Sequence, residues 1–290
     1  MSETIKRATG LLVIEVVNSN PNGDPERESD PRQRPNGCGE ISPVSFKRKL
    51  RDMLEDHNSP FFNALPKEFI DNAERYNILE QRGRNRDSIS NEMGTDPAKF
   101  LESTFVSKYW DARVFGNTFL EKEQSKGFIK TGVVQFGMGV SLAPINIIRQ
   151  TNTNKAGVER DKTSGMAPLA YRIVEHGVYY MPFFVNPNYA HKTGCTTEDV
   201  ELLKLLIPHA YEMNRSAIRP DVRIRHAWYI EHKSILGSCP EHLLIEALTP
   251  IKLENKDRPS ITWNDYQDKT GLPEELYSRV ASVVDLITLS

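Results

Sequence analysis

Residues 11–17 read LLVIEVV, an apolar run rich in β-branched side chains. A run of this length is typical of one buried strand. A long polar stretch follows, in which Pro21, Gly23 and Pro25 supply dense turn chemistry. Ser42 and Pro43 then have the character of an N-cap and a first helical position. The sequence therefore predicts a buried strand, a polar loop and a helix that runs to about residue 57.

The predicted helix has an apolar face, with Phe46 and Leu50 one turn apart, that would dock it on a sheet. Its first turns carry basic residues, where the helix dipole disfavours cations: Lys47, Arg48, Lys49 and Arg51. Arg48 could pair with Asp52, and Arg51 with Glu55, which would make this an ordinary surface helix. Alternatively, a phosphate bound near the helix start would use both the free N–H groups and the bases.

The middle of the chain is less regular. Residues 58–105 are interpreted as a mixed helical and loop insertion, punctuated by prolines and a glycine. Residues 109–117, YWDARVFGN, are interpreted as a strand edge or turn that reaches the core through Trp110 and Phe115. Residues 132–143 are predicted to form a strand.

A polar segment rich in Asn and Thr occupies residues 144–171, between the strand-like stretches INIIRQ and LAYRIV. This pattern predicts a hairpin that projects from the body. Residues 178–185, VYYMPFFV, are predicted as the next strand, with Pro182 marking an edge or a bulge. The aromatic residues of this strand could stack bases, although such density is more typical of a core.

The second half completes an alternation of helix and strand. Residues 197–213 predict a helix, with Thr197 at or near its cap, and residues 222–231 predict the final strand. The tail, 236–290, is expected to contain a modest strand at 243–253 and a short helix from Pro273. The order is close to the split βαβ plan of ferredoxin-like and RNA-recognition folds. We therefore expect an α+β protein, with residues 1–290 forming a single domain.

Charge is unevenly distributed along the chain. The formal net charge is only -2, but residues 239–290 hold nine acidic residues against five basic ones. Elsewhere the basic residues gather in four clusters, at 47–51, 82–86, 149–162 and 215–225. A neutral average with concentrated bases is typical of a protein with one anion-binding groove, although any single cluster could be solvated surface.

Several function classes find no support in the sequence. No apolar run is long enough to span a membrane, and the N-terminus lacks the apolar segment of a signal peptide. Cys38, Cys195 and Cys239 form no C-x-x-C pair, which argues against a zinc site and fits a reducing cytoplasm. The motifs H-E-x-x-H and G-x-S-x-G do not occur. We expect no metal and no cofactor.

The acidic residues of the polar loop leave one catalytic alternative open. Asp24 and Asp30 could form a metal-dependent nuclease centre, since such enzymes aim carboxylates at a phosphate. Calcium-loop spacing is absent from this stretch. The predicted hairpin offers a binding alternative. Its polar arms carry four basic residues, and Met166 could wedge between the nucleobases of a single-stranded nucleic acid.

Taken together, these segments resemble a known family. Its marks here are NPNGDP after the first strand, the helix VSFKRKLRD, the segment YWDARVFG, and TGVVQFGMGVSLAPI followed by RQTNTN and ERDKTSGMAP. In this order they resemble the repeated backbone subunit of the type I-C CRISPR Cascade complex, within the repeat-associated mysterious protein superfamily. The resemblance spans roughly residues 8–235.

The resemblance implies a modified RNA-recognition fold likened to a hand. The sheet and helices would form a palm, residues 58–105 the helical fingers, and residues 145–172 a projecting β-hairpin thumb, with 236–290 as a C-terminal extension. Such subunits are not enzymes: copies stack along one CRISPR guide RNA and present it to target DNA in antiviral defence. Other Cascade subunits would be further partners, and the complex would be cytoplasmic.

The same resemblance implies which residues contact RNA: Asn20, Asn22, Gly23, Lys47, Arg48, Lys49, Arg51, Arg113, Arg149, Asn152, Arg160, Lys162 and Met166. Arg113 could equally be structural. A related branch of the superfamily cleaves RNA with an aspartate near the first strand's loop, and Asp24 and Asp30 lie in a comparable region. A metal-dependent ribonuclease and a stand-alone RNA-binding module therefore stay as alternatives to the scaffold.

Overall fold

The apolar run forms β1 (Ala8–Ser19), a central strand of an antiparallel sheet. The structure, a computed structural model, describes residues 4–81, 97–116, 130–153 and 168–288. Leu12 and Ile14 of β1 pack in one hydrophobic core, while Leu11 and Val13 pack in a second core. The run is continuous rather than alternating because both faces of the strand are covered.

Among the described residues the sheet has eight strands, in the order β12-β9-β1-β8-β6-β4, with β5 and β7 also paired to β8. The neighbours of β1 are β8 (Pro168–Val185) and β9 (Val222–His232). β8 in turn pairs with β5 (Val134–Phe136) and β6 (Gly139–Pro144), and β4 (Cys38–Ile41) lies beyond β6. This mixed architecture of helices and one large antiparallel sheet agrees with the predicted α+β class.

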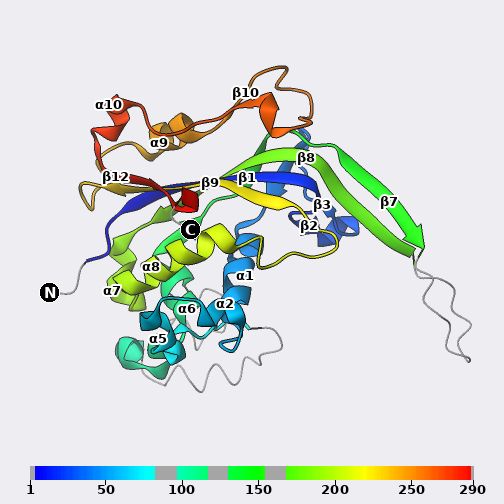
Figure 1. Ribbon diagram of the computed structural model, residues 1–290. Helices are drawn as coiled ribbons and strands as arrows, with labels where there is room; N and C mark the ends of the chain where they lie inside the picture. The colour runs from blue at the N-terminus through cyan, green and yellow to red at the C-terminus, as the bar shows by residue number, and fades with distance from the viewer. Residues whose placement is uncertain (1–3, 82–96, 117–129, 154–167, 289–290) are drawn as a thin grey trace, which may run out of the picture.

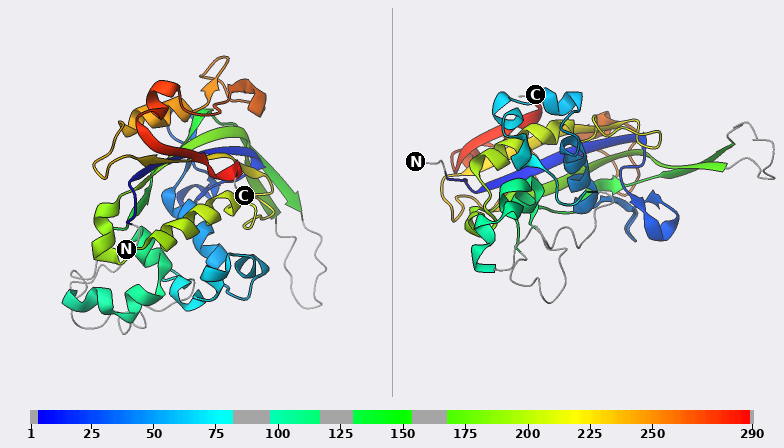
Figure 2. Two further views of the ribbon diagram at one scale, coloured as in Figure 1. Left: turned by 60° about the vertical axis from the view of Figure 1, so that its left-hand side comes forward. Right: turned by 90° about the horizontal axis from the view of Figure 1, so that it is seen from below.

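The predicted hairpin and the predicted strand after it share one long strand. The first part of β8 pairs with β7 (Ile147–Thr153), and its second part crosses the sheet beside β1. Figures 1 and 2 show β7 and β8 extending together beyond the body. Pro182 lies inside the sheet rather than on an edge strand, opposite the interruption between β5 and β6, where its carbonyl accepts the Gly137 N–H at 2.7 Å.

Helices cover one face of the sheet, as Figure 1 shows. α1 (Pro43–Leu54) begins at the predicted N-cap, where Ser42 Oγ accepts the Ser45 N–H. Phe46 and Leu50 of α1 are fully buried in the first core together with α8 (Thr197–Leu206), which continues into the 3₁₀ turn η6 (Ile207–His209). The sequence placed both helices correctly, although it extended each beyond its observed end.

The described part of the 58–105 segment is a series of short helices joined by turns. It contains α2 (Pro60–Asn63), α3 (Lys67–Ile70), η2 (Ala73–Tyr76), η3 (Pro97–Glu102) and α5 (Thr104–Lys108). The prediction of a strand edge or turn at 109–117 was wrong, because this segment forms α6 (Trp110–Phe115), ended by Gly116 at φ 87°. Trp110 and Phe115 do reach the core, and this packing overrides the local β propensity.

The C-terminal extension covers the opposite face of the sheet (Figure 1). The strand predicted at 243–253 is mostly helix: α9 (Glu241–Leu248) buries Leu244 and Leu248 in the second core, and only β10 (Ile251–Lys252) is extended. The predicted short helix is α10 (Glu274–Tyr277). β9 is not the final strand, because β12 (Val280–Asp285) pairs with it. Smaller elements complete the fold: β2 (Gly23–Asp24), η1 (Pro25–Arg27), β3 (Asp30–Pro31), η5 (Pro187–Tyr189), α7 (Ala190–Thr193), η7 (Trp263–Asp265), β11 (Tyr266–Gln267) and η8 (Leu286–Thr288).

The aromatic residues of the 178–185 stretch divide between core and partial exposure. Tyr179 and Phe183 are fully buried, whereas Tyr180 and Phe184 are half-buried. This matches the expectation that aromatic density here means packing. None of the described helices has both the length and the apolar character needed to cross a bilayer.

Candidate nucleic-acid interface

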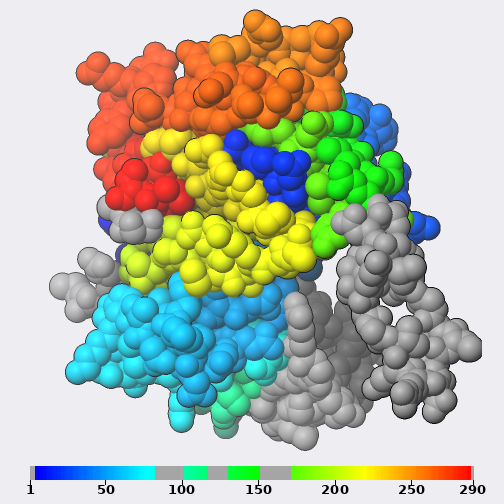
Figure 3. Space-filling model, turned by 45° about the vertical axis from the view of Figure 1, so that its right-hand side comes forward, coloured from blue at the N-terminus to red at the C-terminus, as the bar shows by residue number. Residues whose placement is uncertain are grey.

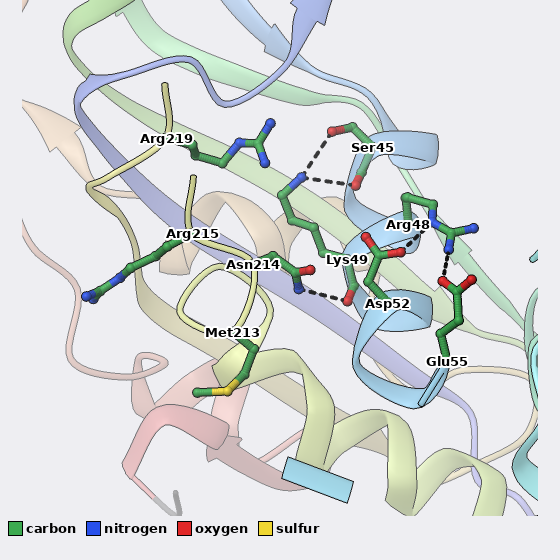
Figure 4. A pocket seen from close by; sticks show the side chains of 9 residues that line it. All are labelled: Ser45, Arg48, Lys49, Asp52, Glu55, Met213, Asn214, Arg215 and Arg219. Atoms are coloured by element: carbon green, nitrogen blue, oxygen red, sulfur yellow. Dashed lines mark hydrogen bonds and ion pairs between the residues drawn. The ribbon is translucent and has the colours of Figure 1, made fainter. Parts of the chain in front are cut away.

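A basic pocket of about 660 Å³ opens between α1 and the loop that joins η6 to β9. Figure 4 shows the two sides of this pocket facing each other. Its lining residues come from segments that are distant in the sequence: Ser45, Arg48, Lys49, Asp52 and Glu55 from α1 and its end, and Met213, Asn214, Arg215 and Arg219 from the loop. We call this site the α1 pocket.

Hydrogen bonds fix the loop against both α1 and the end of β1. The Asn214 side chain donates to the carbonyls of Lys49, at 3.1 Å, and Ala210, at 2.9 Å. The Arg219 Nε donates to the Asn20 carbonyl at 3.0 Å, and the Asn20 N–H donates to the Ile218 carbonyl at 2.7 Å. In Figure 3 the yellow segment that carries this loop lies at the surface, between the blue helices and the green strands.

Lys49 lies at the inner wall of the α1 pocket and is only 4% exposed. Its Nζ lies 3.3 Å from both the carbonyl and the Oγ of Ser45, and 5.2 Å from the ring centre of Tyr211. Burial, reinforced by the neighbouring charge of Arg219, lowers the pKa of Lys49 to about 7. An anion in the pocket would favour the protonated form of this amine.

The two loop arginines differ in their setting. The Arg219 guanidinium is half-buried and points toward the Lys49 side of the pocket, whereas Arg215 is exposed and extends outward (Figure 4). Neither was among the residues expected to bind RNA. The signal was present, because both belong to the basic cluster at 215–225, but only the fold brings that cluster to α1.

Arg48 is tied to acidic neighbours on its own helix. It pairs with Asp52 at 2.6 Å, as predicted, and also with Glu55, and it donates to the Glu80 carbonyl. The prediction that Glu55 pairs with Arg51 was wrong, because Arg51 turns toward the interior. These carboxylates lower the net positive charge at the α1 end of the pocket, so Lys49 and the loop arginines carry most of its attraction for an anion.

Arg51 and Arg113 are buried inside the protein. Arg51 is 3% exposed and pairs with Asp111 at 2.8 Å and with Glu80 at 3.0 Å. Arg113 is 1% exposed: it contacts both oxygens of Asp199, at 2.9 and 2.6 Å, and donates to the carbonyls of Val106 and Arg75. In this conformation a phosphate has no access to either guanidinium, and we assign both residues structural roles.

Lys47 is half-buried, with its Nζ 5.0 Å from the ring centre of Phe115. Burial, together with the nearby charge of Arg51, lowers the pKa of Lys47 to about 8. This amine therefore lies on a different side of α1 from the pocket, over an aromatic ring. A favourable cation–π contact of this kind stabilises the packing of α1 against α6.

The polar loop is more ordered than its composition indicates. Asn20 is buried, and its amide donates to the carbonyls of Ser29, at 2.8 Å, and Arg172, at 3.0 Å. Asn22 Oδ1 accepts the Ser42 N–H at 2.7 Å, which joins the loop to the start of α1. Gly23 belongs to β2, which pairs with β3. These three residues hold the loop that borders the site.

The acidic candidates of the loop are engaged with protein groups. Asp24 Oδ1 accepts the Glu26 N–H at 3.2 Å and caps η1. Asp30 pairs with both Arg149 and Arg172. The hydrogen bond from Arg149 holds the pKa of Asp30 below its usual value. Within the described ranges, no group of three or more His, Cys, Asp or Glu side chains gathers in a metal-binding arrangement.

The hairpin contributes the remaining predicted residues. Arg149 is exposed on β7, and Asn152 lies opposite Leu169 in the β7–β8 register. Arg160, Lys162 and Met166 lie outside the described residues. The base of the hairpin is joined to the polar loop through Asn20, which in turn contacts the loop of the α1 pocket. Four segments therefore lie next to one another: the polar loop, α1, the 210–221 loop and the base of the hairpin.

Comparison with known proteins places the chain in a family. The profile of "CRISPR-associated protein Cas7" matches residues 6–270. A CRISPR-associated protein Cas7 of Haloferax volcanii is 27% identical over 228 residues, which is 70% of this chain and 63% of the relative. The chain therefore spans 63% of the length of that relative.

Solved structures resemble the chain more loosely. A chain of a CRISPR RNA-guided surveillance complex in a pre-nicking form aligns with a TM-score of 0.45 and 13% identity, covering 77% of each chain. A chain of the Type III-B Cmr-beta complex bound to cognate target RNA aligns with a TM-score of 0.43 and 9% identity, covering 78% of this chain and 61% of the other. Because the family profile matches most of its length, the chain belongs to the CRISPR-associated protein Cas7 family.

Proposed function

We propose that this chain is a non-catalytic backbone subunit that binds CRISPR guide RNA, and that several copies assemble along one RNA. The observation that carries the proposal is the α1 pocket, where Lys49 and Arg219 converge and Arg215 stands at the outer side. A chain with a net charge of only -2 concentrates positive charge at this site. The sequence motifs favour the type I-C class of complex.

The chemistry of the α1 pocket suits a phosphate rather than a base. Its described lining consists of charged and polar side chains and one methionine, with no aromatic ring on which a base could stack. Contacts of this kind position a nucleic-acid backbone and carry no sequence information. Sequence would instead be read by pairing between the guide and a target DNA, as in other RNA-guided complexes. This is the behaviour that a guide-presenting scaffold needs.

The surroundings of the pocket support a hand-like division of labour. The β7–β8 hairpin extends from the sheet beside the pocket and would act as a thumb that folds over the strand, while the helical insertion would act as fingers on an RNA-recognition-type palm. Of the two nuclease candidates, Asp30 is neutralised by two guanidinium groups, which disfavour a bound metal cation, and Asp24 caps η1. This arrangement supports a scaffold over a metal-dependent ribonuclease.

An RNA titration of Arg215→Gln tests the proposal. Each lost phosphate contact should weaken binding of a labelled single-stranded RNA and reduce the slope of log affinity against log salt by about one. Arg258→Gln is the matched control, because it removes an exposed arginine from the C-terminal extension. Equal RNA affinity and equal salt slopes for the two variants and the unmodified chain would refute the pocket as the RNA site.

A further inference from the structure

Two arginines face each other directly at the base of the hairpin. Arg149 of β7 and Arg172 of β8 are register partners in the antiparallel pair. Like charges at directly opposed positions repel and destabilise a strand pair. The two guanidinium groups therefore repel each other at the point where the hairpin leaves the body, and an anionic partner is needed to offset this repulsion.

Two carboxylates of the polar loop bind them in the free chain. Asp30 contacts both arginines: its Oδ2 accepts from Arg149, and its Oδ1 lies 3.3 Å from the Arg149 Nε and 3.3 Å from the Arg172 Nη1. Glu28 pairs with the other terminal nitrogen of Arg172. The Asp30 side chain is 11% exposed, whereas that of Glu28 is 80% exposed.

The backbone between these carboxylates has an unusual conformation. Glu28 and Ser29 have φ values of 50° and 66°, in the left-handed region that residues other than glycine seldom adopt. The Asn20 amide donates to the carbonyls of Ser29 and Arg172 and so fastens this turn to β8. The turn is held in place by the surrounding structure, and its shape delivers both carboxylates to the arginine pair.

We propose that Arg149 and Arg172 form a phosphodiester-binding site, separate from the α1 pocket, in which Glu28 occupies the place of the phosphate until RNA arrives, while Asp30 stays bound to both arginines. Guanidinium groups bind carboxylate and phosphate oxygens with the same forked geometry, so one anion can replace the other. Glu28 is the exchangeable partner, because an exposed ion pair contributes little and its carboxylate regains water on leaving. Asp30 stays buried and keeps the opposed arginines from repelling each other.

This inference rests on the proposed RNA binding and adds a consequence for affinity. RNA must compete with Glu28 at the hairpin base, so the free chain is held below its full affinity. Removing the competing charge should therefore tighten binding, whereas removing an unrelated acidic charge should not. The effect should also depend on Arg172, because that guanidinium is the group for which carboxylate and phosphate compete.

The test compares RNA affinity by fluorescence anisotropy in Glu28→Gln and in the control Glu254→Gln, an exposed acidic residue of the C-terminal extension. Glu28→Gln should lower the dissociation constant about two- to fivefold, as expected for loss of an exposed ion pair. In an Arg172→Gln background the same change should have no effect. Thermal unfolding of each variant checks that the fold is retained, and Glu28 is chosen over Asp30 because its exposed side chain supports no buried group.

Three outcomes overturn the inference. Glu28→Gln binds RNA as the unmodified chain does; its gain equals that of Glu254→Gln; or the gain persists without Arg172, which would show a general charge effect. Suppose that the unmodified chain binds RNA, that Arg215→Gln weakens this binding and that Glu28→Gln leaves it unchanged. The Arg149–Arg172 site is then refuted, and the proposed RNA binding stands. If neither the unmodified chain nor Glu28→Gln binds RNA, the proposed function fails as well.

Discussion

Arg113 holds the insertion to α8 from a fully buried position. Its guanidinium contacts both oxygens of Asp199, and Asp199 also accepts the Thr196 N–H in the capping box of α8. Replacing Arg113 with Met would remove the close cation partner of the buried Asp199, whose other guanidinium neighbour, Arg75, lies 4.0 Å away. Breaking a buried ion pair by removing one partner costs about 3–5 kcal/mol. We therefore expect Arg113→Met to lower the free energy of unfolding, measured by urea denaturation, by that amount.

The double variant Arg113→Met/Asp199→Asn is the control for this prediction. Because it removes both charges, it should recover part of the lost stability, as replacement of a whole buried pair often does. A single variant within about 0.5 kcal/mol of the unmodified chain would contradict the structural role. It would return Arg113 to the list of RNA-contacting candidates.

We expect Lys49 to make the proposed RNA binding depend on pH. Its pKa is about 7 in the folded chain against 10.5 ordinarily, so the folded chain loses this proton first as pH rises. Without RNA, the fold gains stability from this group as pH rises from about 7 to about 10, because the unfolded chain binds the extra proton. A bound phosphate favours the charged amine, so RNA affinity should fall as pH rises through 7.

Anisotropy titrations at about pH 6 and about pH 8 measure this dependence, in a range where the ordinary phosphodiester does not titrate. No histidine lines the described part of the α1 pocket. Lys49→Met should bind more weakly at the lower pH and should lose most of the pH dependence. An unchanged pH dependence in that variant would show that another group is responsible.

Single residues also mark the limit of what the sequence could predict about the site. The basic cluster on α1 pointed to the helix that lines the α1 pocket, but Arg51 and Arg113 look the same in a sequence as Arg215 does. Whether each arginine side chain points into the protein or toward solvent is decided by an ion-pair partner far along the chain, which is Asp111 for Arg51 and Asp199 for Arg113. No local pattern carries that information.

At the scale of elements, the start of α1 determines how the polar loop meets the pocket. The Ser42 Oγ accepts the Ser45 N–H at 3.2 Å, and the backbone N–H of Ser42 donates to the Asn22 Oδ1. Ser42→Ala should lower the free energy of unfolding by about 1 kcal/mol, because one N–H of the first turn loses its acceptor. Urea denaturation measures this loss, with Val44→Ala, 72% exposed in the same turn, as the control. Equal effects of the two substitutions would argue against the cap.

Elements whose signals are local could be predicted, and those shaped by packing could not. β1, α1, α8 and β9 each carry a cap, a continuous apolar run or a periodic apolar pattern, and each lies where the sequence indicated. α6 and α9 were missed because short segments with mixed patterns take their conformation from the cores they enter. Trp110 in α6 and Leu244 in α9 are each fully buried by residues that a local window does not contain.

At the scale of the whole molecule, the C-terminal extension adds a second layer to the sheet. It is joined to β9 by His226, whose ring contacts Asp285 at 2.6 Å and Asp268 at 3.0 Å. Although burial opposes protonation, the two carboxylates raise the pKa of His226. The extension is also the acidic part of the chain, with nine acidic residues against five basic ones, so charge is separated between it and the basic region that includes the α1 pocket.

We expect this separation of charge to favour the proposed assembly of copies on one RNA, because the acidic extension of one copy can lie against a basic surface of the next. Light scattering of the chain with single-stranded RNAs of increasing length should therefore show the number of bound copies rising with length. The variant Arg215→Gln/Arg219→Gln should stay monomeric at the same concentrations, because it lacks the phosphate contacts that bring copies together. A constant single copy on every RNA would instead identify a stand-alone RNA-binding module.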